Sequence, residues 1–194
     1  MLKQNDDLYG IEVIEFINKK KDEFCERDGL RWVVIGSPAE STAWKFGKYN
    51  KSKYPNSAIV NGSEGNYYLT NSHHINVAEG TIGEHIDNAS VYHRLSKGGC
   101  ILHIWLNEAF SSAEAFWSLN KKIISKGVQF WDYTKTFSYC NICGFKINDD
   151  IDECPVCGGK DISKSTRITG YYLDIRTFND GKLEENNDRN YQKL

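Results

Sequence analysis

The most chemically capable side chains in the sequence form two Cys-x-x-Cys pairs that are separated by ten residues: Cys140, Cys143, Cys154 and Cys157. Two such pairs bring four thiolates into a tetrahedron, the geometry that zinc accepts most readily. Gly144 and Gly158 follow the pairs and permit the tight turn behind each one. A shell of four sulfurs leaves no position for a substrate, so the spacing predicts a structural zinc site. A rubredoxin-like iron site uses similar spacing and stays open as the alternative.

A second candidate segment is Ser37-Pro38-Ala39-Glu40-Ser41-Thr42, which directly follows an apolar run. Ser37 can cap a helix, Pro38 suits the first helical position, and Glu40 would complete a capping box. A helix N-terminus exposes backbone N–H groups to which Ser41 and Thr42 add hydroxyl donors, a combination that suits a phosphate. Most capped helices bind no anion, so the residues alone leave a simple cap and a phosphate site both open.

A third candidate is the glycine in Arg167-Ile168-Thr169-Gly170-Tyr171. Considered only for structure, Gly170 marks a turn or a close contact between aromatic neighbours. On the residues alone, that structural interpretation is favoured over a functional one.

Hydrophobic periodicity and turn residues predict the elements that must position these candidates. In chain order they are a helix over 8–28, a buried strand over 30–35, a helix over 39–48, a short extended segment over 67–70, a strand over 100–106, a helix over 112–126 and a strand over 128–133. Strands that alternate with helices predict an α/β fold with parallel strand pairing.

The overall composition excludes several classes of function. The chain has 194 residues and a formal net charge of −2, so no general basic field attracts nucleic acid or an anionic membrane. No apolar run approaches the roughly 20 residues of a membrane span, and the start lacks a signal-peptide core, so we expect a cytoplasmic protein. Many zinc ribbons bind nucleic acid, but here acidic residues occupy the loop between the cysteine pairs: Asp149, Asp150, Asp152 and Glu153.

Taken together, the segments resemble the C-terminal region of class III ribonucleoside-triphosphate reductases, the anaerobic glycyl-radical enzymes. In chain order the resemblance is carried by Ser37–Ala43, Thr70–His74, Gly98-Gly99, the cysteine pairs, Arg167–Tyr171, Phe178-Asn179, Gly181-Lys182 and Arg189. It implies the C-terminal part of a ten-stranded glycyl-radical-enzyme α/β barrel over 1–136, a zinc ribbon over 137–160, and a glycyl-radical loop with the tail over 161–194.

The resemblance also implies roles for individual residues. Gly170 would be the catalytic residue, a radical installed by a separate iron–sulfur activase that uses S-adenosylmethionine. The segment from Ser37 to Thr42 would bind the phosphates of a ribonucleoside triphosphate, and His74 would line the substrate site, although a core histidine is an equal interpretation. Glycine suits a radical because its amide nitrogen and carbonyl both delocalise the spin and no Cβ crowds a planar centre.

The cysteine that attacks substrate in the family lies upstream of the matching region, and Cys25 and Cys100 are poor substitutes for it. Because the chain starts with Met1 but resembles only the last third of the family, we expect a split subunit or a truncated fragment that is inactive alone. Its partners would be the N-terminal part of the reductase on another chain, the activase, and a second copy in a homodimer of the complete enzyme. If the chain is phage-encoded, the compartment is the host cytoplasm. A stand-alone radical carrier that repairs a damaged enzyme is the alternative.

Overall fold

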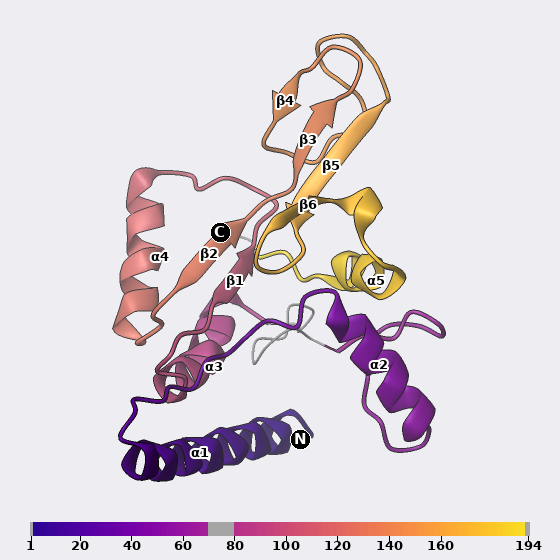
Figure 1. The fold of residues 1–194 in the computed structure, drawn as a ribbon. Coiled ribbons are helices and arrows are strands. Elements are labelled where there is room, and N and C mark those ends of the chain that lie inside the picture. The colour runs from indigo at the N-terminus through magenta and orange to yellow at the C-terminus, as the bar shows by residue number, and fades with distance from the viewer. Residues whose placement is uncertain (1, 70–79, 193–194) are drawn as a thin grey trace.

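The structure is a computed structural model that describes residues 2–69 and 80–192. His74, which the resemblance assigns to the substrate site, lies outside the described residues. Among the helices in the described ranges, none has the length and apolar character that crossing a bilayer requires. The described part contains a two-stranded sheet with helices beside it and a separate four-stranded sheet, one end of which projects away from the helices (Figure 1).

The first helix, α1, spans Leu2–Asp28 and ends where the sequence predicts. Gly29 follows with a φ of 65°, and its N–H donates to the carbonyl of Cys25 at 3.0 Å, which closes the last turn. α1 packs on α3, which spans Ile82–Leu95. The Nδ2 of Asn18 donates to the carbonyl of Leu95 at 2.9 Å and fixes this contact.

The predicted buried strand over 30–35 is wrong in two respects. The segment is extended, but only Ile35 forms a bridge, a parallel one with Gly99, and Gly98 N–H donates to the carbonyl of Val34 at 2.7 Å. Its apolar side chains are also exposed, with 60% of Leu30 and 58% of Ile35 accessible. The described chain supplies no further strand to cover this run, so its hydrophobicity does not translate into burial.

The second helix, α2, spans Thr42–Lys53 and so begins later than residue 39 and ends later than residue 48. Glu40 has a φ of 48°, a left-handed conformation that no α-helix continues through. Gly47 lets α2 approach the following chain, since a Cβ there would lie 2.7 Å from the Cα of Tyr68. The segment expected to be extended over 67–70 forms one bridge, between Asn61 and Tyr68.

Helix α3 was not predicted, although the sequence contains its start signal. The hydroxyl of Thr81 accepts from Glu84 N–H at 3.3 Å, and the Glu84 carboxylate accepts from Thr81 N–H at 2.7 Å. This reciprocal pair is a capping box.

The predicted parallel pairing is confirmed in the two-stranded sheet. Strand β1 spans Leu102–Trp105 and strand β2 spans Trp131–Thr134, with Leu102 opposite Trp131. Between them runs α4, Ala113–Ser125, which confirms the helix predicted over 112–126 and is capped by Ser112. The core lies among α3, β1 and α4 and consists of Ile86, Ala89, Leu102, Ile104, Leu106, Ile123 and Val128.

The second sheet is antiparallel and has the strand order β4-β3-β5-β6. Its strands are β3 (Phe137–Cys140), β4 (Lys146–Ile147), β5 (Ile162–Arg167) and β6 (Tyr172–Asp174). A 3-10 turn, η1 (Ile175–Thr177), leads into α5, Asp180–Asp188. Helix α5 packs on α2, and Gln192 then bridges to Leu106 just after β1. The C-terminal end of the chain thus returns to the two-stranded sheet.

Candidate metal centre and glycine loop

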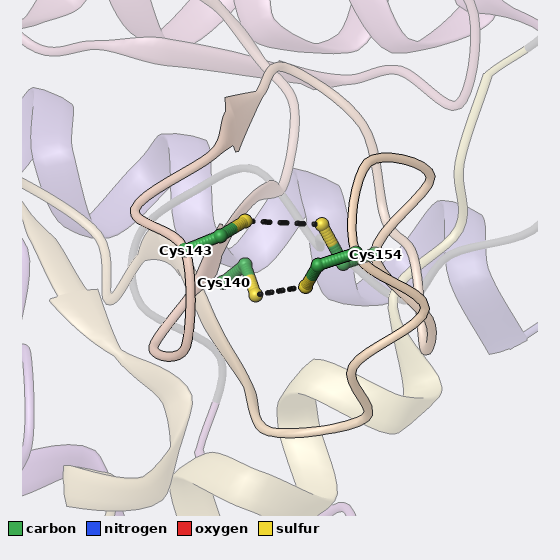
Figure 2. A group of neighbouring side chains, drawn as sticks. Cys140, Cys143 and Cys154 are labelled. Carbon is green, nitrogen blue, oxygen red and sulfur yellow. Dashed lines mark hydrogen bonds between the residues drawn. The ribbon is translucent and has the colours of Figure 1, made fainter.

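The four paired cysteines converge at the far end of the second sheet (Figure 2). The Sγ atoms of Cys140 and Cys157 lie 3.7 Å apart, those of Cys143 and Cys154 lie 3.6 Å apart, and all four lie within 4.8 Å of one another. A tetrahedral zinc with Zn–S bonds of about 2.3 Å requires S···S separations of roughly 3.8 Å. The sulfur positions therefore fit a four-thiolate zinc site.

The two cysteine knuckles have the same backbone geometry. Gly144 N–H donates to the carbonyl of Cys140 at 3.0 Å, and Gly158 N–H donates to the carbonyl of Cys154 at 2.9 Å. Both glycines have a positive φ, 78° and 67°, which confirms the tight turns that the sequence predicts. The site is continuous with strand β3, because Cys140 is its last residue. A bound metal would thus hold the end of the same sheet whose β5–β6 loop contains Gly170.

Gly170 lies in the loop that joins β5 to β6, and Ile168 N–H donates to the carbonyl of Tyr171 at 2.9 Å across this loop. Ile168 and Thr169 are buried, whereas Gly170 and Tyr171 are exposed. Gly170 does not adopt the positive φ seen at eight other glycines of the described chain. The backbone conformation of this turn therefore does not require glycine, which weakens the purely structural interpretation.

The carboxylate of Glu40 contacts Gly170 directly. Gly170 N–H donates to Oε1 of Glu40 at 2.8 Å, and a Cβ built on Gly170 would lie 2.7 Å from the same oxygen. Since Glu40 points at Gly170, the predicted capping box with Ser37 is wrong. The N-cap of α2 is Ser41, which forms no side-chain cap hydrogen bond. The structure thus brings the Ser37–Thr42 segment against the glycine loop.

The guanidinium of Arg167 contacts the backbone carbonyl of Gly170. Nη1 of Arg167 donates to the carbonyl of Gly170 at 3.0 Å. The Nε of Arg167 lies 2.8 Å from Oδ2 of Asp132 on β2, and both side chains are largely covered. The ion pair joins the glycine loop to the two-stranded sheet and aims the guanidinium at Gly170.

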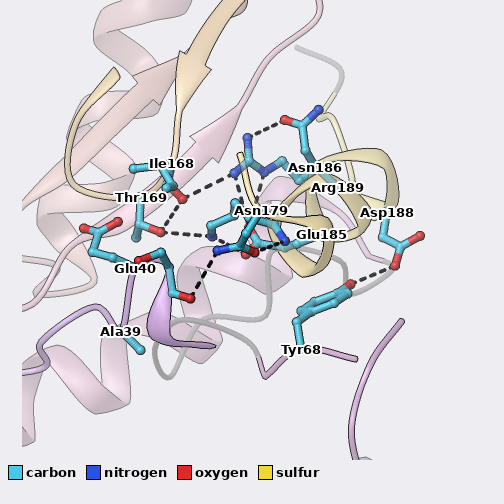
Figure 3. Close-up of polar contacts among 12 residues, drawn as sticks. Ala39, Glu40, Tyr68, Ile168, Thr169, Asn179, Glu185, Asn186, Asp188 and Arg189 are labelled. Atoms are coloured by element: carbon cyan, nitrogen blue, oxygen red, sulfur yellow. Dashed lines mark hydrogen bonds and ion pairs between the residues drawn. The ribbon is translucent and has the colours of Figure 1, made fainter. Parts of the chain in front are cut away.

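A group of buried charged residues lies beside Ile168 and Thr169 of the loop (Figure 3). Lys182 forms an ion pair with Glu185, and Glu185 accepts from Nη2 of Arg189 at 3.2 Å. Nζ of Lys182 also donates to Oγ1 of Thr169 at 3.3 Å, and the Arg189 guanidinium lies 3.8 Å from the ring centroid of Trp105. We call these three charged residues, Lys182, Glu185 and Arg189, the α5 triad. It connects the residue before Gly170 with strand β1.

Electrostatics at the α5 triad reflect its burial. Burial lowers the pKa of Lys182, while the negative charges of Glu185 and Glu40 oppose that shift. Next to the triad, the buried hydroxyl of Tyr68 donates to Asp188 at 2.8 Å, and burial together with that carboxylate raises its pKa. The C-terminal segment is therefore fixed to the body of the chain by polar groups.

The remaining predicted site residues lie around α2. Asn179 caps α5, and its Nδ2 donates to the carbonyl of Ser41 at 3.3 Å. The Thr42 hydroxyl donates to the carbonyl of Ala39, so it serves the local turn. Ser37 and Ser41 are exposed, whereas Pro38, Ala39 and Glu40 are partly buried.

Neither of the two isolated cysteines belongs to the glycine loop or to the α5 triad. Cys25 is in α1, where its sulfur accepts from Trp32 N–H at 3.3 Å. Cys100 is buried, and burial raises the pKa of its thiol to about 11. Burial disfavours the thiolate form of Cys100, which agrees with the expectation that Cys100 is a poor substitute for the cysteine that attacks substrate.

Two residues that contribute to this site were missed by the sequence analysis. Asp132 lies in a predicted strand where no spacing marks it, and Glu185 lies in a run of charged residues that usually indicates a solvated helix face. The spacing of Lys182, Glu185 and Arg189 at i, i+3 and i+7 is the signal that could have suggested a shared face.

The fold and the site define an α/β chain with a four-cysteine cluster whose geometry is compatible with zinc, and a glycine loop held against the body of the chain. A family model described as anaerobic ribonucleoside-triphosphate reductase matches residues 3–191. The chain therefore belongs to the anaerobic ribonucleoside-triphosphate reductase family.

Individual relatives agree with that assignment. The chain is 27% identical over 189 residues to the anaerobic ribonucleoside-triphosphate reductase of Enterobacteria phage T4, covering 91% of this chain and 30% of that protein. It is 25% identical over 189 residues to the Escherichia coli K12 enzyme, covering 91% of this chain and 26% of that one. The chain thus spans less than a third of the length of these relatives.

Solved structures show the same fold. One anaerobic ribonucleotide reductase superposes with a TM-score of 0.80 at 21% identity, over 97% of this chain and 29% of that one. The Thermotoga maritima anaerobic ribonucleotide reductase in complex with dATP and CTP superposes with a TM-score of 0.67 at 21% identity, over 92% of this chain and 28% of that one.

Proposed function

We propose that this chain is the radical-bearing C-terminal portion of an anaerobic ribonucleoside-triphosphate reductase, with Gly170 as the radical residue. In this proposal the complete enzyme reduces ribonucleoside triphosphates to deoxyribonucleoside triphosphates for DNA precursor synthesis in the cytoplasm. A separate activase removes one hydrogen atom from Cα of Gly170; the atom bonds to a carbon radical that the activase generates from S-adenosylmethionine, and one unpaired electron stays on Cα. The three regions 1–136, 137–160 and 161–194 then supply barrel segments, the zinc ribbon and the radical loop.

One observation carries the proposal: the exposed Gly170 contacts Glu40 of the segment that the resemblance assigns to substrate phosphates. The two segments are 130 residues apart in the chain. Glycine is also not demanded by the turn conformation, as its φ is not positive. Both facts favour a role for the glycine itself at a site shared with the Ser37–Thr42 loop.

The same contact favours a reductase portion over a detachable radical carrier. A carrier needs only the C-terminal segment, whereas here α5 packs on α2 and Asn179 bonds to Ser41. The first part of the chain therefore belongs to the same site. The Thermotoga maritima relative whose structure contains dATP and CTP supports a nucleotide substrate.

The exposed apolar run over 30–35 supports completion by the rest of a reductase. Leu30, Trp32, Val33 and Ile35 lie close together in the chain and are all exposed, and soluble proteins rarely leave so many neighbouring large apolar side chains uncovered. In the proposal, the remaining barrel strands cover this run and supply the cysteine that attacks substrate. The complete enzyme would then form a homodimer.

The primary experiment is anaerobic activation of this chain together with the complementary reductase portion and the cognate activase. We expect a glycyl-type doublet in the electron paramagnetic resonance (EPR) spectrum, absent in Gly170→Ala. Zinc content serves as the folding control for the variant, because the cysteine site is built on the same sheet. A doublet that persists in Gly170→Ala would overturn the assignment.

Nucleotide binding separates the reductase portion from a radical carrier. The complemented protein should bind a ribonucleoside triphosphate, and Ser41→Ala should weaken binding several-fold by removing a hydroxyl donor at the start of α2. Ser52→Ala near the end of the same helix is a matched control that should leave affinity unchanged. Equal affinity in all three proteins would remove the phosphate role of this loop.

A further inference from the structure

The backbone N–H and C=O of Gly170 each form a hydrogen bond with a charged side chain, and the two side chains have opposite charges. The Glu40 carboxylate accepts from its N–H at 2.8 Å, and the Arg167 guanidinium donates to its C=O at 3.0 Å. The amide nitrogen and the carbonyl are the two groups that flank Cα. Both hydrogen bonds are charge-assisted, a kind that is about twice as strong as a neutral hydrogen bond.

We propose that Glu40 and Arg167 form an electrostatic clamp that stabilises an unpaired electron on Cα of Gly170 and fixes the plane of that centre. The inference rests on the proposed function, because it concerns the radical that the proposal assigns to Gly170. Glu40 becomes a positioning residue for the glycine, a role that the resemblance did not assign to it. Arg167 has the complementary role on the carbonyl.

The physical basis is the way a glycine-centred radical is delocalised. The amide nitrogen donates electron density towards Cα, and the carbonyl withdraws it. A carboxylate that accepts from the N–H makes the nitrogen a better donor, whereas a guanidinium on the oxygen makes the carbonyl a better acceptor. The charges at Gly170 have the signs that strengthen both effects; the reverse arrangement would weaken them.

The clamp is held in place from outside the loop. Asp132 lies 2.8 Å from Nε of Arg167, which leaves Nη1 to donate to Gly170. Glu40 has a φ of 48°, a conformation that is uncommon for a residue with a side chain. Residues in such conformations are retained where the surrounding structure fixes them.

The loop also leaves room for a planar centre. Gly170 is exposed, and among the described residues only the Glu40 carboxylate approaches the position of a Cβ within 4 Å, with Oε1 at 2.7 Å and Cδ at 3.8 Å. A side chain at position 170 would therefore displace the group that binds its N–H. The clamp therefore explains why residue 170 is a glycine, which the backbone conformation of the turn does not explain.

The test uses the complemented and activated protein with Glu40→Gln and Arg167→Gln. Glu40→Gln keeps the size and a carbonyl acceptor but removes the charge. The readouts are radical per chain, anaerobic radical lifetime, and the coupling of the electron spin to a ¹⁵N label at Gly170. Because carboxylate removal weakens donation from nitrogen, we expect a smaller ¹⁵N coupling and a several-fold lower radical yield in Glu40→Gln.

Arg167→Gln should lower the yield as well, but should change the coupling of a ¹³C label at the Gly170 carbonyl more than the ¹⁵N coupling. A merely structural defect would reduce the yield without moving either coupling. If Arg167→Gln fails to fold, Asp132→Asn loosens the same guanidinium without touching the loop, and should alter the carbonyl coupling in the same direction.

Two matched controls distinguish the clamp from general charge effects. Glu184 also accepts from a backbone N–H, that of Ser63 at 3.1 Å, and Arg176 also pairs with an aspartate, Asp174 at 2.5 Å. Glu184→Gln and Arg176→Gln should leave yield and couplings unchanged. Wild-type couplings and lifetime in folded Glu40→Gln and Arg167→Gln would overturn the clamp alone. A wild-type protein without any glycine-centred radical would overturn the proposed function and the clamp with it.

Discussion

Nζ of Lys182 in α5 donates to Oγ1 of Thr169, the residue before Gly170, at 3.3 Å. Both side chains are buried, with Lys182 2% and Thr169 1% exposed. The C-terminal helix thus fixes the glycine loop from below, while Glu40 contacts it from the body of the chain. Asp132 on β2 adds a third contact through its ion pair with Arg167, so the loop is held by groups from three parts of the sequence.

Lys182→Met should destabilise the protein strongly. The substitution removes one of the cations that neutralise the buried Glu185, and breaking a buried ion pair costs about 3 kcal/mol. The free energy of unfolding in urea measures the effect. Lys164→Met is the control, because Lys164 pairs with two exposed carboxylates, Asp150 and Asp152, and exposed pairs contribute at most about 1 kcal/mol each. Equal effects of the two substitutions would refute the importance of the α5 triad.

Metal removal should loosen the second sheet. We expect about one zinc per chain, and Cys140→Ser should lower zinc content and speed hydrogen exchange across β3 and β5, since metal binding at such sites supplies folding energy. Cys25→Ser in α1 should retain both zinc and protection. A metal-free protein whose β3 amides stay protected would contradict the structural role.

The free energy of unfolding should decrease as the pH is lowered below about 6.5, because of His93. The side chain is fully buried, and Nδ1 accepts from Gln129 N–H at 3.2 Å. Burial lowers its pKa to about 4, below the unfolded value of about 6.5. The folded state thus resists protonation that the unfolded state accepts. Its contribution is complete above pH 6.5 and is lost as pH falls towards 4.

The measurement compares urea unfolding at pH 7 and pH 5 in the wild type and in His93→Gln. At about 1.4 kcal/mol per pH unit, the wild type should lose roughly 2 kcal/mol more than the variant over this interval. The buried His85 and His103 are present in both proteins and cancel in the comparison. Parallel losses would show that His93 does not titrate in this way.

The cysteine centre was predictable from sequence because its spacing is local. The Cys-x-x-Cys pairs and their glycines determine each knuckle within a few residues, and the structure brings the four sulfurs within 4.8 Å. Helices α1 and α4 and the parallel pairing of β1 with β2 were predictable for the same reason, from periodicity and caps.

The contacts around Gly170 were not predictable, because they join residues far apart in the chain. Glu40 fits a capping box by spacing, but its carboxylate accepts from Gly170 N–H instead, and the helix begins only at Thr42. The hydrophobic run over 30–35 indicated burial, yet burial depends on a covering surface that the described chain does not supply. The prediction that His74 lines the substrate site stays a prediction.

The central claim, that Gly170 bears the radical, is tested most directly by exposing the activated, complemented protein briefly to air. A glycyl radical reacts with oxygen and breaks the backbone at its own residue, so mass spectrometry reports its position. We predict a shortened chain that has lost the segment from Gly170 to Leu194, and an uncut chain in Gly170→Ala. An intact wild-type chain, or a break at another residue, would contradict the account.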